Sequence, residues 1–230
     1  MTAEPGPDHA AHMDGIYRTQ RYIYDATRKY YLLGRDRMLD GLKPPTGARV
    51  LEVGCGTGRN LILAARRYPL VRFYGFDISK LMLETAQANI TRAGMASRIK
   101  LTHGDAANFN ADAMFHLPTF ERVYISYALS MIPPWRAALE QALNAVGPGG
   151  SLHVVDFGQQ AGLPPWFKSG LHAWLAKFTV EPRAELEAEL AALAKKTGAS
   201  LSFNHLYRDY AHLAVITKPV EVTTAKITSI

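Results

Sequence analysis

Short apolar runs alternate with longer amphipathic segments along most of this chain. Runs rich in β-branched and aromatic residues predict strands, whereas apolar positions that recur every three to four residues predict helices. Strands are predicted at residues 49–53, 71–76, 98–102, 121–126, 150–156 and 211–217, and near 199–205. Helices are predicted at residues 13–40, 59–67, 79–93, 134–145, 164–178 and 182–197. This alternation is typical of a parallel, doubly wound α/β sheet.

Local signals define several helix ends. Ser79 is suited to cap the helix that follows it, and Gly94 to end that helix. Gly198 follows two lysines and ends the last helix. The last two strands are separated by too few residues for a crossover, so we expect them to pair antiparallel.

The most informative segment is a glycine-rich loop after the first predicted strand, where residues 50–60 read VLEVGCGTGRN. A buried strand that turns on glycine into a helix brings backbone N–H groups and the positive end of the helix dipole to one point. Glycine also lets a ligand approach the backbone closely. The loop therefore predicts a site for a nucleotide-like ligand.

Acidic residues follow the next two strands. Asp77 ends the second, where a carboxylate is placed to hold ribose hydroxyls. The third is followed by Gly104, Asp105 and Ala106. A Gly-Pro-Gly-Gly turn at 147–150 precedes the fifth strand.

Glu52, the glycines of the loop, Asp77, the Gly104–Asp105 pair and the 147–150 turn together resemble class I S-adenosylmethionine-dependent methyltransferases, over roughly residues 40–218. The resemblance implies a Rossmann-like, seven-stranded, mostly parallel sheet of order 3-2-1-4-5-7-6, with strand 7 antiparallel and helices on both faces. It also implies S-adenosyl-L-methionine as cofactor and S-adenosyl-L-homocysteine as product. A dinucleotide-dependent dehydrogenase is the rival interpretation, disfavoured because no second nucleotide-binding half follows.

The resemblance assigns roles to individual residues. The loop glycines would line the amino-acid end of the methyl donor, and Glu52 would orient the loop. Asp77 would hold the ribose, and Asp105 the adenine amino group, with Ala106 beside it. The cofactor-binding residues expected in all are Tyr24, Arg28, Glu52, Gly54, Cys55, Gly56, Gly58, Asn60, Asp77, Ile78, Gly104, Asp105, Ala106 and Ser126.

The amino-terminal segment repeats with a period of seven. This period places tyrosines and arginines along one helical face, namely Tyr17, Tyr24 and Tyr31 beside Arg21, Arg28 and Arg35. One interpretation is an amphipathic helix with packed rings and solvated arginines. The other is a ligand site, because guanidinium groups clamp carboxylates and aromatic faces hold cations. From the spacing we expect Tyr24 and Arg28 to reach the donor carboxylate.

Residues 13–37, with the loop that follows, resemble bacterial betaine-lipid N-methyltransferases, which convert diacylglyceryl-homoserine to its trimethylated form. The resemblance implies successive methylation of the headgroup amine at an anionic membrane surface, with the enzyme that makes diacylglyceryl-homoserine as a candidate partner. Another lipid amine, a soluble amine, RNA and a non-catalytic donor-binding module remain alternatives. RNA is disfavoured because strand 4 ends in ISYAL, without the Asn/Asp-Pro-Pro-Tyr signature of base-amino methyltransferases.

The predicted helix at 164–178 carries a stripe of large apolar residues, with Lys168 and Lys177 near its edges. This pattern fits either an interfacial helix or a cap that closes a pocket.

Methyl transfer to an amine is an in-line displacement that depends on alignment, and the amine must be neutral to attack. The candidates for catalytic residues are Tyr24, Tyr31, Tyr127 and His153. His153 alternates with apolar residues in a strand and is also consistent with a core position.

Composition sets the remaining limits. The chain has 230 residues, a net charge of +6 and one cysteine, Cys55, which reads as a small residue filling the turn. These features suit a cytoplasmic protein with an anionic partner, peripheral to the inner face of the membrane. The eight histidines are dispersed, so no metal site is expected. We predict an arm at 1–12, a helical cap at 13–42, a methyltransferase domain at 43–218 with an insert at 158–180, and a tail at 219–230.

Overall fold

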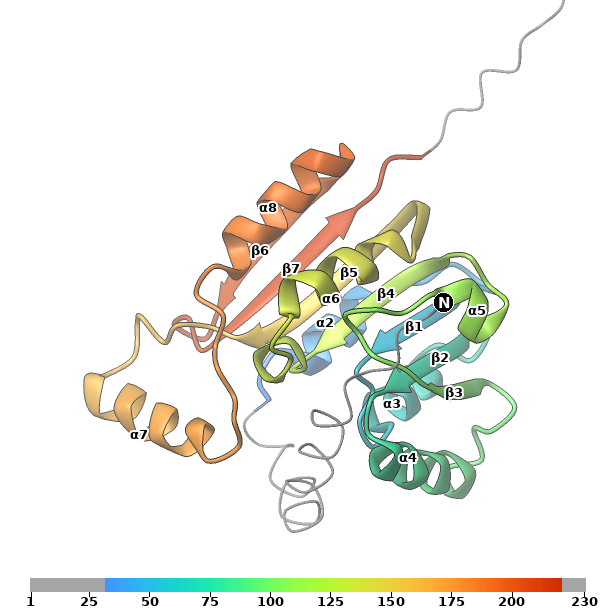
Figure 1. Ribbon diagram of the computed structural model, residues 1–230, viewed down its shortest axis with the longest axis horizontal. Coiled ribbons are helices and arrows are strands. Elements are labelled where there is room, and N and C mark those ends of the chain that lie inside the picture. The colour runs from blue at the N-terminus through green and yellow to red at the C-terminus, as the bar shows by residue number, and fades with distance from the viewer. Residues whose placement is uncertain (1–31, 221–230) are drawn as a thin grey trace, which may run out of the picture.

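The computed structural model describes residues 32–220, which form a seven-stranded sheet covered by helices (Figure 1). The strands are β1 (Arg49–Val53), β2 (Arg72–Asp77), β3 (Ile99–His103), β4 (Phe120–Ser126), β5 (Val146–Phe157), β6 (Ser200–Leu206) and β7 (Ala211–Thr217). Their order is β3-β2-β1-β4-β5-β7-β6, and β7 is antiparallel to both neighbours. The predicted topology is thereby confirmed.

Two sets of helices cover the two faces of the sheet. The helices are α2 (Arg35–Gly41), α3 (Arg59–Arg67), α4 (Lys80–Arg92), α5 (Ala111–Phe115), α6 (Trp135–Asn144), α7 (Pro165–Ala176) and α8 (Leu186–Thr197), with a short 3-10 turn, η1 (Leu129–Met131). Buried side chains of α2, α3 and α7 belong to one core cluster, and those of α5, α6 and α8 to the other. The helices therefore form a layer on each side of the sheet, as predicted.

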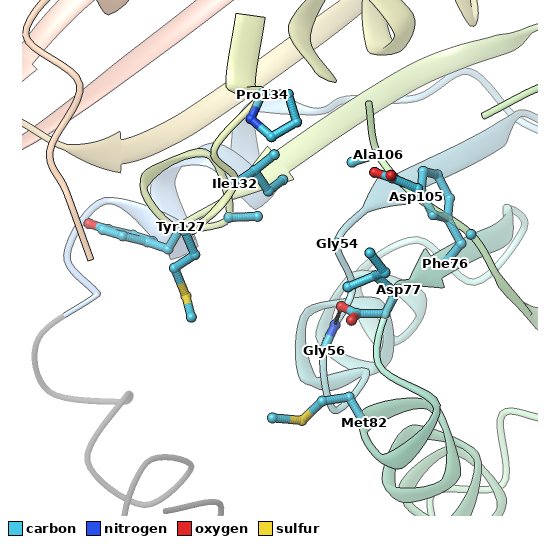
Figure 2. Close-up of a pocket in the computed structure, with 14 residues that line it drawn as sticks. Gly54, Gly56, Phe76, Asp77, Met82, Asp105, Ala106, Tyr127, Ile132 and Pro134 are labelled. Atoms are coloured by element: carbon cyan, nitrogen blue, oxygen red, sulfur yellow. Dashed lines mark hydrogen bonds between the residues drawn. The ribbon is translucent and has the colours of Figure 1, made fainter. Parts of the chain in front are cut away.

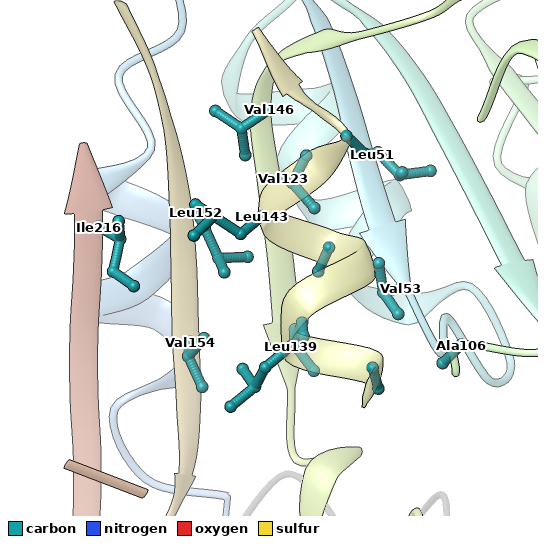
Figure 3. Close-up of a cluster of buried hydrophobic side chains, with 14 of the residues drawn as sticks. Leu51, Val53, Ala106, Val123, Leu139, Leu143, Val146, Leu152, Val154 and Ile216 are labelled. Carbon is teal, nitrogen blue, oxygen red and sulfur yellow. The ribbon is translucent and has the colours of Figure 1, made fainter. Parts of the chain in front are cut away.

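The core under α6 holds the central strands in place (Figure 3). Leu139 and Leu143 of α6 lie over Val123, Leu152 and Val154 of β4 and β5, and all five side chains are buried. Burying a leucine or valine side chain stabilises a fold by about 1.5–3 kcal/mol. This packing holds β4 and β5 in place, and the same cluster includes Leu51 and Val53 of the neighbouring strand β1.

Most predicted boundaries lie within a few residues of the observed ones, and the Ser79, Gly94 and Gly198 signals are confirmed. Several elements differ. The short helix α5 and the 3-10 turn η1 were not predicted, α8 begins at Leu186 rather than 182, and β5 begins at Val146 rather than 150. The 147–150 turn lies within β5, where pairing with β4 shifts from Phe120 opposite Val146 to Arg122 opposite Ser151. The glycines thus form an irregularity in the strand rather than a separate turn.

Of the predicted helix at 13–40, only residues 32–40 are described, and the prediction is wrong at their start. Residues 32–34 are not helical, because Gly34 has a left-handed conformation with a φ of 83°, and α2 begins after it at Arg35. The arm at 1–12, most of the cap and most of the tail lie outside them, and the domain boundaries stay predictions. In the part of the chain that the structure describes, no helix combines the length and apolar character needed to cross a membrane.

Replacing Gly75 with alanine tests the fit between β2, the glycine-rich loop and α3. A Cβ at Gly75 would lie 2.6 Å from Cδ1 of Leu61 and 3.1 Å from Cβ of Cys55. We expect Gly75→Ala to lower the free energy of unfolding by about 1–3 kcal/mol, because an overpacked core forces side chains from their preferred positions. Urea unfolding measures this. Gly41→Ala is the control, since nothing lies within 4 Å of a Cβ there; equal losses in both variants would contradict the expectation.

Candidate functional site: two adjoining pockets at the strand ends

The glycine-rich loop begins where β1 ends and leads directly into α3. Gly54, Gly56 and Gly58 all have positive φ, of 70°, 51° and 75°. Side chains would also be obstructed at two of these positions, because a Cβ would lie 3.0 Å from Ala128 at Gly54 and 3.1 Å from Ala86 at Gly58. Gly58 caps α3 without a side-chain hydrogen bond, which leaves the amino-terminal turn of the helix for a ligand.

Asp77 fastens this loop to the end of β2. Its Oδ2 accepts the N–H of Gly56 at 2.8 Å, and its Oδ1 accepts the N–H of Ser79 at 3.0 Å. Ser79 in turn caps α4 by accepting the N–H of Met82. Each carboxylate oxygen can accept more than one hydrogen bond, so holding the loop and α4 is compatible with contact to a ligand diol.

Figure 2 shows the pocket beside Asp77, hereafter the Asp77 pocket. The side chains of Phe76, Asp77 and Asp105 form one wall, and Tyr127, Ile132 and Pro134 form the opposite wall. The full lining comprises Gly54, Gly56, Phe76, Asp77, Ile78, Met82, Gly104, Asp105, Ala106, Tyr127, Ala128, Met131, Ile132 and Pro134. The pocket therefore combines apolar walls with two carboxylates, a lining that suits an aromatic base joined to a sugar.

A second pocket adjoins the first at Gly54 and is hereafter the Glu52 pocket. Its lining comprises Leu32, Arg35, Glu52, Gly54, Cys55, Thr57, Arg59, Asn60 and Ser126. Glu52 is buried and its two oxygens accept hydrogen bonds from the side-chain amide of Asn60 at 2.8 Å and the hydroxyl of Tyr124 at 3.0 Å. These bonds compensate the burial of its charge and orient the loop.

Two groups make the Glu52 pocket suitable for a charged, hydrogen-bonding ligand. Arg35 is 5% exposed, and its guanidinium contacts the carboxylate of Asp36 at 3.2 Å. Ser126 ends β4, and its Oγ is buried without a hydrogen-bond partner among the described residues. A buried hydroxyl without a partner costs free energy, which a ligand that reaches it would recover.

Cys55 fills the turn, as expected. It is 5% exposed, and burial raises the pKa of its thiol well above the ordinary value. Its Sγ packs where a Cβ at Gly75 would lie. A thiol in this environment is a packing group rather than a nucleophile.

Tyr127 links the Asp77 pocket to the start of the described chain. It has a positive φ of 54°, its ring packs edge-on against Phe157, and its hydroxyl donates to the carbonyl oxygen of Leu33. Burial raises the pKa of this phenol well above its usual range. Tyr127 therefore acts as a protonated donor that positions residue 33 above the pocket.

His153 lies in the middle of β5, between Tyr124 of β4 and Val215 of β7, and lines neither pocket. Its Nε2 lies 2.8 Å from the hydroxyl oxygen of Ser151, and the residue is 3% exposed. Burial, and then the charge of Arg122, lower its pKa to about 4. This environment is that of a neutral core histidine.

The structure thus brings together all the expected cofactor-binding residues from Glu52 to Ser126 except Gly58, which lines neither pocket and packs against Ala86 of α4. Tyr24, Arg28 and Tyr31 lie outside the described residues. Sequence reasoning missed Arg35 as a lining residue, although the period of seven that singled out Arg28 also contains it. It also missed the apolar wall from Met131 to Pro134, which carries no motif.

The large apolar residues of α7 face the domain. A groove, hereafter the α7 groove, is lined by Leu33, Leu163, Phe167, Leu171, Trp174, Tyr207 and Tyr210. Trp166, by contrast, is 76% exposed. The stripe therefore behaves mainly as a cap, and Trp166 alone presents a large ring to solvent.

Two of the histidines that are dispersed along the sequence come together in the fold. The hairpin of β6 and β7 brings His205, Asp209 and His212 together, with their ligand atoms within 4.8 Å of one another. The sequence concealed this cluster because it depends on the register of the hairpin.

Known proteins are similar to this chain in both sequence and fold. Residues 50–150 match the model of a family described as a methyltransferase domain. The ubiquinone/menaquinone biosynthesis C-methyltransferase UbiE of Cereibacter sphaeroides is 28% identical over 160 residues, which cover 67% of this chain and 62% of that protein. The demethylmenaquinone methyltransferase of Bacillus licheniformis is 31% identical over 126 residues, which cover 54% of this chain and 51% of that protein. The matches thus span less than two thirds of these curated relatives.

Solved structures show the same fold. Phosphoethanolamine N-methyltransferase 2 of Haemonchus contortus, in complex with S-adenosyl-L-methionine, has a TM-score of 0.69 at 18% identity, covering 90% of this chain and 60% of that one. The sheet order is that of the class I methyltransferase fold, and residues 50–150, which contain the glycine-rich loop, match the methyltransferase-domain family. S-adenosyl-L-methionine is the methyl donor of this class.

The pockets fit the chemical parts of that donor. Asp77 and Asp105 supply acceptors for hydroxyl and amino groups between apolar walls. Arg35 supplies a positive charge for a carboxylate, and Ser126 supplies a hydroxyl in need of a partner. The loop glycines allow the backbone to approach the ligand closely.

Replacing Asp77 with asparagine tests the donor site. We expect Asp77→Asn to weaken S-adenosylmethionine binding at least tenfold, because the variant loses a charge-assisted acceptor and can keep only one of the two hydrogen bonds to Gly56 of the loop and Ser79 of α4. Isothermal titration calorimetry measures the affinity. Asp112→Asn, on the exposed side of α5, is the matched control. Affinities within twofold of each other for Asp77→Asn and the unmodified protein would refute the assignment.

The buried His153 predicts a specific acid sensitivity. Its folded-state pKa lies below the ordinary value, so the unfolded chain binds more protons and stability falls as the pH drops through the window from 6.5 to about 4. We expect His153→Gln to remove roughly 2 kcal/mol of the decrease in unfolding free energy between pH 7 and pH 5. Urea unfolding at both pH values measures this, with the exposed His103→Gln as control. An unchanged pH dependence in His153→Gln would overturn the assignment.

Proposed function

We propose that this protein is an S-adenosylmethionine-dependent N-methyltransferase that successively methylates the amino group of diacylglyceryl-homoserine to give the trimethylated betaine lipid. The observation that carries the proposal is a donor site with an apolar groove beside it. The donor site comprises the Asp77 and Glu52 pockets, and Leu33 connects it to the α7 groove. The choice of the lipid headgroup rests on the resemblance of residues 13–37 to betaine-lipid N-methyltransferases.

The donor, when bound, supplies an activated methyl group on a sulfonium. The chain's contribution is to hold it. Asp77 and Asp105 grip its polar edges, while Glu52 keeps the loop in position through Asn60. Arg35, from α2, is a further candidate for the donor carboxylate, beside Arg28 and Tyr24, which the sequence suggested for that role. Fixed groups of this kind favour an in-line displacement because little reorganisation remains at the moment of reaction.

The α7 groove suits an acyl chain. All of its lining residues are leucines or aromatic residues: Leu33, Leu163, Phe167, Leu171, Trp174, Tyr207 and Tyr210. The hydroxyl of Tyr127, a residue of the Asp77 pocket, holds the carbonyl of Leu33, a residue of the groove. An acceptor whose tail lies in the groove would therefore present its headgroup near the donor.

The amine acceptor requires polar and aromatic groups rather than a strong base. Tyr127 keeps its proton and contributes through position. Tyr24 and Tyr31 remain proposed catalytic residues, as aromatic groups that stabilise the positive charge on the methylated nitrogen. His153 is better explained by the core, since it lines neither pocket.

The protein's surroundings follow from the substrate. We propose that it works in the cytoplasm at the inner face of an anionic membrane, which a net charge of +6 favours. Trp166 and Lys168 both lie in the first turn of α7, and an exposed indole ring beside a lysine suits contact with headgroups. The enzyme that makes diacylglyceryl-homoserine is the proposed partner.

Carbon methylation of a demethylmenaquinone is the second candidate. The relatives from Cereibacter sphaeroides and Bacillus licheniformis favour it by their names, and the α7 groove would also suit its apolar tail. The phosphoethanolamine N-methyltransferase shows that the fold serves amines as well.

Product analysis distinguishes the two acceptors. The purified protein is incubated with S-adenosylmethionine and either diacylglyceryl-homoserine or a demethylmenaquinone in mixed micelles. We expect lipid products with one, two and three added methyl groups by mass spectrometry, and no methylated quinone. Methylation of the quinone alone would replace the proposal with the second candidate.

A groove variant tests the role of the acyl chain. Leu171→Gln is expected to lower kcat/KM for the micellar lipid about five- to tenfold, because part of the apolar contact with the tail is lost. Methylation of glyceryl-homoserine, which lacks acyl chains, should be unchanged. Leu70→Gln changes an exposed leucine outside the groove and is the control. Equal losses on both acceptors would remove the groove from the proposal.

A further inference from the structure

The hairpin of β6 and β7 carries a cluster of metal-ligand side chains that the methyltransferase site does not use. His205 of β6 and His212 of β7 are directly paired across the hairpin. Nδ1 of His205 and Nε2 of His212 each lie 2.7 Å from Oδ1 of Asp209, which belongs to the turn between them. Two imidazoles thus share one carboxylate oxygen.

The arrangement is close to that of a three-ligand metal site. A zinc ion bound by two imidazole nitrogens and a carboxylate oxygen at about 2.0 Å holds those atoms roughly 3.3 Å apart in tetrahedral geometry. The three atoms of the cluster already lie within 4.8 Å of one another. A small outward movement of the Asp209 carboxylate therefore makes room for the ion.

The surroundings supply support and access. Glu187 of α8 lies 3.4 Å from Nε2 of His205, where a carboxylate orients a metal-bound imidazole. The side chain of His205 is 52% exposed, whereas those of Asp209 and His212 are 13% and 5% exposed. The ion would thus enter from the His205 side, and water would complete its coordination.

The carboxylate of Asp209 is held from behind. Its Oδ2 accepts the N–H groups of Gln159 and Ala161 at 3.1 and 3.2 Å. Tyr207, Arg208 and Asp209 all have positive φ, a strained turn that must be stabilised by its contacts. A preorganised carboxylate loses little freedom when it binds an ion.

We propose that His205, Asp209 and His212 form a binding site for a divalent transition-metal ion of the zinc class. In the hydrogen-bonded state both rings donate an N–H to Asp209, so on metal binding each proton moves to the other ring nitrogen, and the ion takes the vacated lone pairs. The two imidazoles and one carboxylate form a donor set that suits zinc.

A metal ion at this site would stabilise the segment that leads into α7. Asp209 holds the 159–161 segment that leads from β5 toward α7, and Gln160 of that segment accepts a hydrogen bond from His172 of α7 at 2.7 Å through its Oε1. Tyr207 and Tyr210, on either side of Asp209, line the α7 groove. A bound ion would therefore rigidify the part of the α7 groove that the turn between β6 and β7 forms.

Zinc titration of the tag-free, full-length protein tests this site. We expect one Zn²⁺ per chain by isothermal titration calorimetry, and a rise in Tm on adding Zn²⁺. His205→Gln changes a half-exposed residue and should weaken Zn²⁺ binding at least tenfold and abolish the rise in Tm. Asp209→Asn should weaken it similarly. Unchanged S-adenosylmethionine affinity in His205→Gln would show that the variant is folded.

The remaining histidines provide the matched control. The double variant His9→Asn/His12→Asn removes the two histidines nearest the amino terminus and should bind Zn²⁺ as the unmodified protein does. Zn²⁺ binding that is retained in His205→Gln, or lost in the double variant, would overturn the proposal. So would the absence of any binding at 1 mM Zn²⁺.

Discussion

The hydrogen bonds of Asp77 hold together the part of the molecule on which the site depends. β1 and β2 are neighbours in the sheet, but their following segments diverge into two different helices. Asp77 accepts one N–H from the glycine-rich loop and another from Ser79, at the start of α4. Both helix starts are thereby fixed relative to the end of β2, and the Asp77 pocket takes its shape from that arrangement.

A second carboxylate supports the loop from the opposite side. Glu52 is buried at the end of β1, where the side chains of Asn60 and Tyr124 donate hydrogen bonds to it. A buried charge without such partners would cost several kcal/mol. The two donors offset this cost and fix the orientation of the Glu52 carboxylate. The loop is therefore held between Asp77 and Glu52, and its three glycines are free to adopt the backbone conformations that a close ligand requires.

The sequence predicted the sheet and most of the site because both are encoded locally. Apolar runs indicate the strands, and the acidic residues of the candidate donor site stand at or just beyond the ends of β2 and β3. Other features depend on contacts distant in the sequence. The five-residue helix α5 is too short to show a period. The place of Arg35 in the Glu52 pocket and the α7 groove both depend on how α2 and the hairpin turn pack. The His205–Asp209–His212 cluster likewise depends on hairpin register.

The position of α7 in the chain has a consequence for how acceptor choice can change. The helix lies in the connection between β5 and β6, and both strands pair with β7. Its first end follows β5, and its second end leads through α8 to β6, on the opposite half of the sheet from β2 and β3, which carry Asp77 and precede Asp105. The insert can therefore change without altering β2 or β3. The segment that follows α7 is tied to η1, beside the Asp77 pocket, because Glu181 donates its N–H to Ser130 and Arg183 donates to Ile132. The proposed donor site and the proposed acceptor groove thus lie on different elements of one domain that meet at η1.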